Sequence, residues 1–239
     1  MKYVLAMILS CLSIIGYAQN FIINNNDSTI TTEYKDGKLW AYHYRDGNVV
    51  GLTCYEAKDD YGKYYQMQIY INNISSQSVT FDPNEINAYL INKKGETISL
   101  EVYTNEEYQK KIKRTQNWAM ALTAFSNGLN TGMAGYQTTY TTQRVGNYTY
   151  STPLTTYNHA AASTARIAAN TQMTIMEQKM KEDRVVREEG YLKKNTIYPD
   201  EAIVGFMNIK RKKGHILTIN IPINRNVYSF VLNVNKKKL

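Results

Sequence analysis

The sequence predicts an α+β fold, an Ig-like antiparallel β-sandwich interrupted by a long inserted antiparallel α-helical hairpin. Residues 28–103 and 191–235 alternate apolar and polar side chains with the period of two that half-buried strands require. Between them, residues 104–190 carry apolar side chains at helical spacing. Neither β region alone has enough strands for a stable core, so we expect residues 20–103 and 191–239 to form one discontinuous sandwich.

Residues 1–19 have the features of a secretory signal peptide. Lys2 gives a positive start, residues 4–15 form an apolar run, and Gly16-Tyr17-Ala18 is a small-x-small cleavage site. The apolar run is too short to span a bilayer. We therefore expect an exported protein, periplasmic or associated with the outer membrane, whose mature chain begins near Gln19.

The chain has two cysteines, Cys11 and Cys54. If Cys11 leaves with the signal peptide, Cys54 has no partner for an intrachain disulfide. Cys54 alternates with Val50 and Leu52, which predicts a small buried apolar side chain. In an alternative interpretation, Ile8-Leu9-Ser10-Cys11 resembles a lipobox, and Cys11 becomes a lipidated first residue.

The first β region, residues 28–103, is predicted to hold about seven strands. One strand places Tyr65, Met67, Ile69 and Ile71 on the same face. Tight hairpins are indicated by three turn pairs, Asp36-Gly37, Asp46-Gly47 and Lys94-Gly95. In the second β region, alternating apolar residues predict strands over 202–209, 217–221 (closed by Pro222) and 228–234.

The insertion is predicted to begin with a capping box at Thr104 and Glu107, flanked by a hydrophobic staple of Tyr103 and Tyr108. An apolar stripe then runs through Tyr108, Ile112, Thr115, Ala119, Leu122 and on to Leu129. A second stripe is made of small residues that allow another helix to approach closely: Ala121, Ala124, Gly128, Gly132 and Gly135.

The second helix of the hairpin is predicted from about residue 160 to Gly190. Its inward stripe consists of Ala162, Ala165, Ala169, Met173, Met176 and Met180. Between the helices, the tip 136–157 is rich in Tyr and Thr, and it is either an ordered β-hairpin or a mobile loop. The candidate interaction residues of this tip are Tyr136, Tyr140, Arg144, Tyr148 and Tyr150.

No catalytic motif, phosphate-binding glycine loop or metal-ligand spacing occurs in the sequence, so we expect no enzyme, cofactor or metal. Glu56, Asp59 and Asp60 offer oxygen ligands around a turn, but their spacing matches no calcium loop and favours a solvated turn. The net charge of +8, or +7 without Lys2, suits a solvated surface or contact with anionic lipid or glycan. In an exported protein we expect no nucleic acid partner.

An aromatic row, Trp40, Tyr42 and Tyr44, lies on one face of a predicted strand. Such a row can stack on sugar rings, although cross-strand packing on a half-buried sheet is its commoner role.

Asp27-Ser28-Thr29 matches a short O-glycosylation pattern with Ser28 as acceptor. Residues 118–135 are too polar to insert into a membrane alone, so the predicted membrane contact is peripheral and made through the tip.

Two stretches, YLKKNTIYPDEAIVGFMNIKRKK and ILTINIPINRNVYSF, together with the Tyr-Ala-Gln-Asn end of the signal, resemble exported envelope proteins of Bacteroidota. Those uncharacterised proteins also have an Ala/Gly-rich helical insertion ahead of this region. The resemblance implies a compartment and a fold, and it carries no activity.

These features together predict a non-enzymatic envelope protein. We expect its helical hairpin to mediate oligomerisation or docking, with an envelope protein or a second copy as the partner. The alternative is a glycan-binding module that uses Trp40, Tyr42 and Tyr44.

Overall fold

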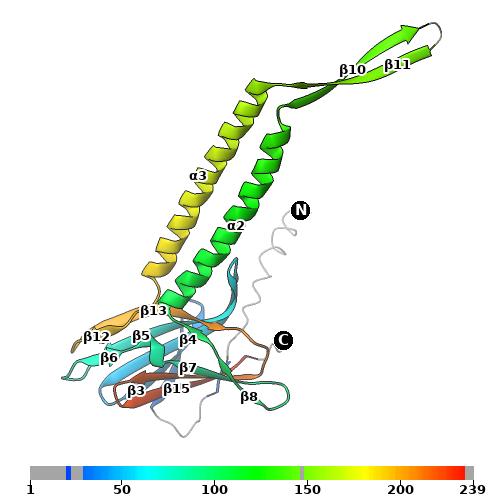
Figure 1. Cartoon of the computed structure of the whole chain (residues 1–239). Helices are drawn as coiled ribbons and strands as arrows, with labels where there is room; N and C mark the ends of the chain where they lie inside the picture. The colour runs from blue at the N-terminus through cyan, green and yellow to red at the C-terminus, as the bar shows by residue number, and fades with distance from the viewer. Residues whose placement is uncertain (1–19, 23–28, 146–147, 235–239) are drawn as a thin grey trace, which may run out of the picture. The chain divides into compact units, whose positions relative to one another are not determined.

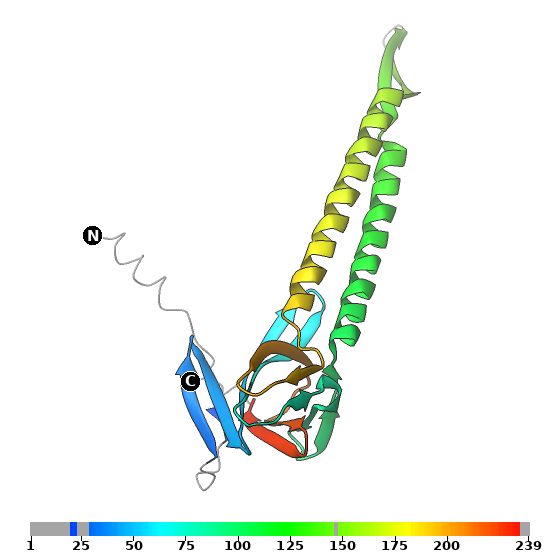
Figure 2. The same cartoon turned by 90° about the vertical axis from the view of Figure 1, so that its left-hand side faces the viewer.

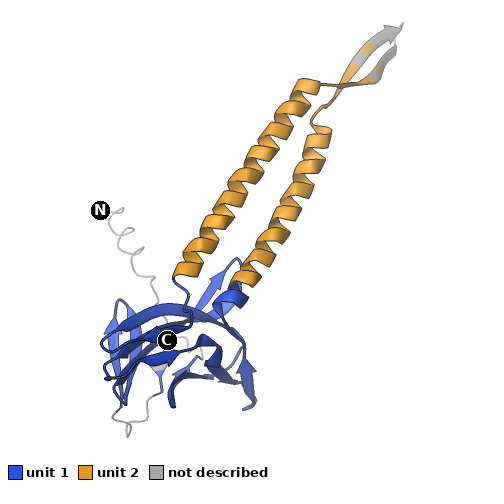
Figure 3. Cartoon of the chain, turned by 60° about the vertical axis from the view of Figure 1, so that its left-hand side comes forward, with its two compact units in different colours: residues 1–108, 190–239 blue, residues 109–189 orange. Residues whose placement is uncertain are grey.

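The computed structural model describes residues 20–22, 29–145 and 148–234, and it confirms the α+β fold class (Figure 1). The predicted signal peptide with Cys11, the candidate glycosylation site Ser28 and the turn at 146–147 lie outside the described residues. The chain divides into two compact units (Figure 3). Unit 1 comprises residues 1–108 and 190–239, and unit 2 comprises residues 109–189.

Unit 1 contains two main antiparallel sheets, and each combines strands from before and after residues 109–189. The six-stranded sheet has the order β2 (Ile30–Lys35), β3 (Lys38–Arg45), β4 (Asn48–Asp59), β5 (Gly62–Asn73), β13 (Ala202–Lys210) and β9 (Val102–Tyr103). The five-stranded sheet has the order β1 (Asn20–Phe21), β15 (Asn226–Asn233), β14 (Ile216–Ile223), β7 (Asn87–Ile91) and β8 (Thr97–Leu100). A short pair, β6 (Val79–Phe81) with β12 (Asn195–Ile197), and a 3₁₀ turn, η1 (Pro83–Glu85), complete the unit.

The turns between the first strands are those that the sequence predicts. Asp36 and Gly37 both have positive φ, 51° and 71°, and so do Asp46 and Gly47, at 48° and 72°. Positive φ at both central residues is the signature of a type I′ turn, which matches the twist of a two-residue hairpin. These turns fix the register of β2 with β3 and of β3 with β4.

Apolar side chains from both sheets make the core of unit 1. Leu52, Met67 and Ile69 are fully buried on the six-stranded sheet, and Leu90 and Ile219 on the five-stranded sheet. Across the core, the ring of His43 on β3 meets the rings of Tyr228 and Phe230 on β15 edge-on, at 5.3 Å and 6.2 Å. The Tyr228 hydroxyl donates to the Arg45 carbonyl over 3.0 Å, which ties the two sheets at their rim.

Four buried tyrosines and a half-buried phenylalanine form a second cluster on unit 1, which we call the aromatic anchor: Tyr64, Tyr103, Tyr108, Tyr191 and Phe206. Tyr108 stacks on Tyr191 at 5.2 Å, and Tyr64 meets both Tyr103 and Tyr108 edge-on at about 6 Å. Tyr191 in turn meets Phe206 at 5.1 Å. The cluster joins residues from β5, β9 and β13 with Tyr108, near the start of the helix that begins at Asn105, and with Tyr191, which lies between named elements.

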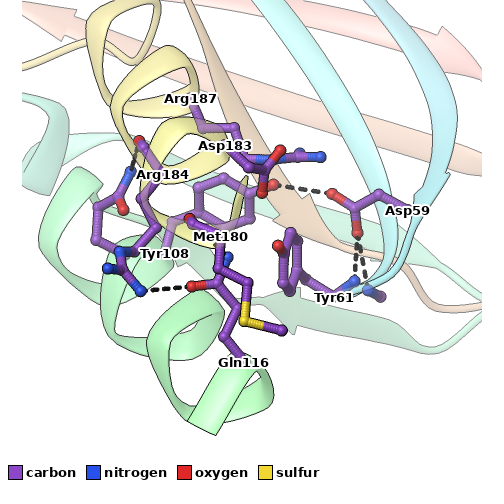
Figure 4. Close-up of polar contacts among 10 residues, drawn as sticks. Asp59, Tyr61, Tyr108, Gln116, Met180, Asp183, Arg184 and Arg187 are labelled. Carbon is purple, nitrogen blue, oxygen red and sulfur yellow. Dashed lines mark hydrogen bonds and ion pairs between the residues drawn. The ribbon is translucent and has the colours of Figure 1, made fainter. Parts of the chain in front are cut away.

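Polar contacts fix the aromatic anchor at both ends. The Tyr191 hydroxyl donates to the Tyr103 carbonyl over 2.6 Å and accepts from the Asn208 amide over 3.0 Å. Burial raises the pKa of Tyr191, so the hydroxyl stays protonated and can donate. The Tyr108 hydroxyl donates to the Asp59 carboxylate over 2.9 Å, and the other oxygen of Asp59 accepts from the Tyr61 and Gly62 amides (Figure 4).

Unit 2 is built from α2 (Asn105–Met133, whose first turn belongs to unit 1), β10 (Tyr136–Val145), β11 (Tyr148–Tyr157) and α3 (His159–Glu189). The predicted capping box is confirmed, because Thr104 N donates to Glu107 Oε2 at 2.9 Å and Glu107 N to Thr104 Oγ1 at 3.3 Å. The two helices lie side by side in both views (Figure 1, Figure 2). β10 and β11 pair antiparallel in continuous register from Tyr136↔Tyr157 onward.

The first prediction concerns the hydroxyl at the centre of the aromatic anchor. Tyr191→Phe removes one buried donor and acceptor, which leaves the Tyr103 carbonyl and the Asn208 amide without this partner. We expect a loss of about 1–3 kcal/mol in the free energy of unfolding, measured by urea denaturation. Tyr198→Phe, at a side chain that is 59% exposed, is the control and is expected to unfold like the unaltered protein. Equal stabilities of the two variants would contradict the assigned role of Tyr191.

Candidate functional site

The two sides of α2 differ in character, and the side on which α2 meets α3 is polar. There, Gln116 is buried; its Nε2 donates to the Met180 carbonyl at 3.1 Å, and its Oε1 accepts from Arg184 at 2.6 Å (Figure 4). Farther along α2, this side carries small polar residues, Thr123, Asn127 and Thr131. The Thr123 and Thr131 hydroxyls donate to carbonyls one turn earlier in the same helix, at 2.9 Å and 2.8 Å. These hydroxyls are therefore satisfied within α2 itself.

The other side of α2 carries five large apolar side chains, which we call the α2 apolar face. Their spacings of three and four residues place them on one side of the helix. They are Trp118, Leu122, Phe125, Leu129 and Met133, with 69%, 53%, 66%, 56% and 74% of each residue exposed. No charged residue occurs between 115 and 133. The helix therefore presents an uncharged apolar strip to solvent and keeps its small polar residues on the less exposed side.

The apolar stripe of α2 that the sequence predicts is buried only at its start. Tyr108 and Ile112 are buried as expected, but Leu122 and Leu129 are more than half exposed. The reason is geometric, because a straight helix drifts by about 20° per seven residues relative to a strict heptad stripe. Leu129 lies three heptads after Tyr108, so its side chain has turned by about 60° toward solvent.

The small-residue stripe also has a different role from the predicted one. Among the residues described, no heavy atom lies within 4 Å of a Cβ added at Gly128 or Gly132. These glycines therefore do not receive α3 but leave open notches beside the α2 apolar face. On α3, the predicted stripe from Ala162 to Met180 is the less exposed side, and Asp183 and Arg187 form an ion pair at 2.9 Å.

The tip of unit 2 is a two-stranded ribbon rather than a loop. Tyr136 and Tyr140, two of the candidate interaction residues, are 62% and 69% exposed. Arg144, Tyr148 and Tyr150 belong to the same ribbon, and their side chains are outside the described set. The structure thus brings all five candidates onto one pair of strands.

A second candidate site lies on unit 1, on the face of the six-stranded sheet opposite the core. The rings of Trp40 and Tyr42 stack at 6.1 Å with an interplanar angle of 15°, and Tyr70 meets Tyr42 edge-on at 6.5 Å. Trp40 and Tyr42 are half-buried, and Tyr44 is 46% exposed. Burial, followed by the negative charge of Glu33, raises the pKa of Tyr42.

This aromatic row depends on a glycine of the neighbouring strand. The Tyr42 ring lies over Gly51, where an added Cβ would fall 2.8 Å from the ring. Beside the row, Lys38 Nζ donates to Gln68 Oε1 at 3.0 Å. The result is a flat patch with two stacked rings, an amide and an ammonium group, which is suited to stacking and hydrogen bonding with a polar ring.

The acidic turn considered for calcium is occupied by internal contacts. Both carboxylate oxygens of Asp59 accept the hydrogen bonds described above, and Glu56 pairs with Arg211 at 2.9 Å. Among the described residues, no group of three or more His, Cys, Asp and Glu side chains is placed to hold a metal ion. Within the same part of the chain, neither helix is long and apolar enough to cross a membrane.

In three comparisons with known proteins, the chain matches no protein-family model, no curated protein and no solved structure.

The second prediction concerns Cys54, which is fully buried, as its alternation with Val50 and Leu52 indicates. Burial, with a smaller effect of Glu56, raises the pKa of the thiol to about 12. Since the thiolate is the reactive form, we expect the native protein to react with a disulfide reagent at pH 8 on the order of a hundredfold more slowly than the unfolded chain. The assay uses a Cys11→Ser variant so that only Cys54 is labelled. Equal rates in native and denaturing buffer would contradict the buried position.

Proposed function

We propose that the protein is a non-enzymatic exported envelope protein. In this proposal, an Ig-like β-sandwich formed by unit 1 carries a helical hairpin, α2 and α3, that mediates self-association or docking onto another envelope protein. The observation that carries the proposal is the α2 apolar face. The sequence features of residues 1–19 support export.

The exposed apolar area of α2 provides a driving force for association. Burying a large apolar side chain is worth roughly 1.5–3 kcal/mol relative to full exposure. On α2, five such side chains are more than half exposed in one continuous strip. Soluble monomers rarely expose contiguous apolar patches of more than a few hundred Å², and larger ones mark interaction sites.

The composition of unit 2 supports the same function. Between residues 115 and 176 the only charged residues are Arg144 and Arg166, and there is no acid. Solvated helices of this length normally carry charges on their exposed sides. Two charges and no acid over these 62 residues are consistent with a surface that another protein covers.

The second candidate function is glycan binding on the six-stranded sheet. The stacked pair of Trp40 and Tyr42 favours it, because half-buried, nearly parallel aromatic rings on a sheet face are groups on which a sugar ring can stack. In that case Lys38 and Gln68 would supply the polar contacts.

The third prediction tests the α2 apolar face. In the double variant Leu122→Glu with Leu129→Glu, two charges interrupt the strip without changing residues that contact α3. We expect the unaltered protein to self-associate, or to bind an envelope protein, and the double variant to lose that association. Sedimentation velocity over a concentration series measures the first, and affinity capture from the envelope of the native host measures the second.

The matched control is Ile167→Glu with Ile175→Glu on α3, whose side chains are 64% and 50% exposed. It adds the same two charges outside the α2 apolar face. Circular dichroism must show equal helix content for all three proteins. If the α2 and α3 variants behave alike, association does not depend on the α2 apolar face and the proposal is wrong.

The fourth prediction tests the glycan alternative. In a Trp118→Phe background, Trp40 is the only tryptophan and its fluorescence reports on the stacked pair. If the stacked pair binds sugar, titration with a β-1,4-linked hexasaccharide will change the emission, and Tyr42→Ala will weaken binding by about tenfold or more through lost stacking. Tyr34→Ala, on the neighbouring strand at 65% exposure, is the control. Emission that is unaffected by the hexasaccharide counts against this candidate.

A further inference from the structure

We propose that the α2 apolar face binds the same face of a second copy, with the two α2 helices antiparallel about a two-fold axis at Phe125. The inference rests on the proposed function, since it names the partner of that surface.

An antiparallel pair centred on Phe125 places each residue opposite the residue equally far on the other side of position 125. Trp118 then lies opposite Gly132 of the second copy, and Leu122 lies opposite its Gly128. Both glycines have open space around their Cβ positions in the part of the chain that the structure describes. Two large side chains of each copy thus meet a notch of the other, and Phe125 meets Phe125 on the axis, as a self-complementary two-fold interface allows.

Charge favours the antiparallel over the parallel arrangement. Lys111 and Arg114 precede Trp118 by seven and four residues, so they continue the same side of α2. A parallel in-register pair would set Lys111 against Lys111 and Arg114 against Arg114, where like charges repel. It would also set Trp118 against Trp118 and leave Gly132 facing Gly132. The antiparallel pair separates the four cations to opposite ends.

The area available matches a weak but specific dimer. With exposures of 53–74%, the five side chains present at most about 600 Å² per copy, if each is counted at about 200 Å², the middle of the range that an aromatic side chain buries. Two copies would then bury about 1,200 Å², the lower end of specific interfaces.

The same strip is poorly suited to a lipid surface. An interfacial helix carries Lys or Arg on its polar face, whereas here that side holds Thr123, Asn127 and Thr131.

Single-cysteine variants test the two-fold axis directly in a Cys11→Ser background, where the remaining Cys54 is buried. Under mild oxidation, Phe125→Cys is expected to form a reducible dimer, because only position 125 faces itself. Trp118→Cys and Gly132→Cys are each expected to stay largely monomeric alone and to form a mixed dimer when combined. Thr123→Cys, on the side toward α3, is the control and is expected not to crosslink.

Gly132→Leu separates a matched interface from unspecific apolar contact. The added side chain has open space within the single chain, and it replaces a poor helix former, so the helix itself is not weakened. If Trp118 of the second copy occupies the notch, the dimer dissociation constant rises by about tenfold or more, because overpacking is destabilising. If contact is unspecific, the extra apolar area strengthens association.

The outcomes that overturn the inference are distinct from those that overturn the proposed function. Self-crosslinking of Trp118→Cys and Gly132→Cys as efficient as that of Phe125→Cys, or tighter association of Gly132→Leu, rejects the antiparallel pair while self-association stands. A monomer at every concentration rejects the second copy as partner. The proposed function then still stands if the protein captures an envelope protein that the Leu122→Glu, Leu129→Glu variant does not.

Discussion

The hydrogen bond from Tyr191 to the Tyr103 carbonyl is the contact on which the rest of the chain depends. Tyr103 is the last residue of β9 before α2, and Tyr191 follows the end of α3, so a single 2.6 Å contact closes the base of the insertion. The same hydroxyl accepts from Asn208 on β13, which fixes this closure to the six-stranded sheet. Domain insertion is tolerated where the two ends of the inserted segment lie close together. The sheet can therefore complete itself with β13, β14 and β15 after the chain returns.

In unit 2, the polar and apolar sides of α2 are the reverse of those usual in paired helices. Helices in proteins draw most of their stability from packing an apolar face against the rest of the fold. On α2, the side toward α3 instead carries Gln116, Thr123 and Thr131, and the large apolar side chains point to solvent. The α2 side of the helix pair is thus polar, although α3 contributes Ala and Met side chains, and the large apolar side chains of α2 are left exposed.

The sequence predicts well those elements whose signals are local. Period-two alternation, the Asp-Gly pairs with positive φ and the reciprocal capping box all depend on neighbouring residues, and each is found as expected. The aromatic anchor was not predictable, because it brings together Tyr64, Tyr108 and Tyr191 from distant parts of the chain. On α2, apolar residues occur on more than one side of the helix. Periodicity alone does not say which side faces α3, although the spacing 118, 122, 125, 129 carries the signal of a coiled-coil seam.

The two candidate surfaces differ in how much of their apolar area the chain itself already covers. On the six-stranded sheet, Trp40 stacks on Tyr42, Tyr42 covers Gly51, and Tyr70 closes the edge, so much of the aromatic area is buried without any ligand. A sugar there would gain only the remaining exposed ring surface. The α2 apolar face has no such internal cover, with Trp118 and Phe125 about two-thirds exposed and open notches at Gly128 and Gly132. Since the hydrophobic gain scales with the apolar area newly removed from water, association through α2 is the stronger of the two driving forces.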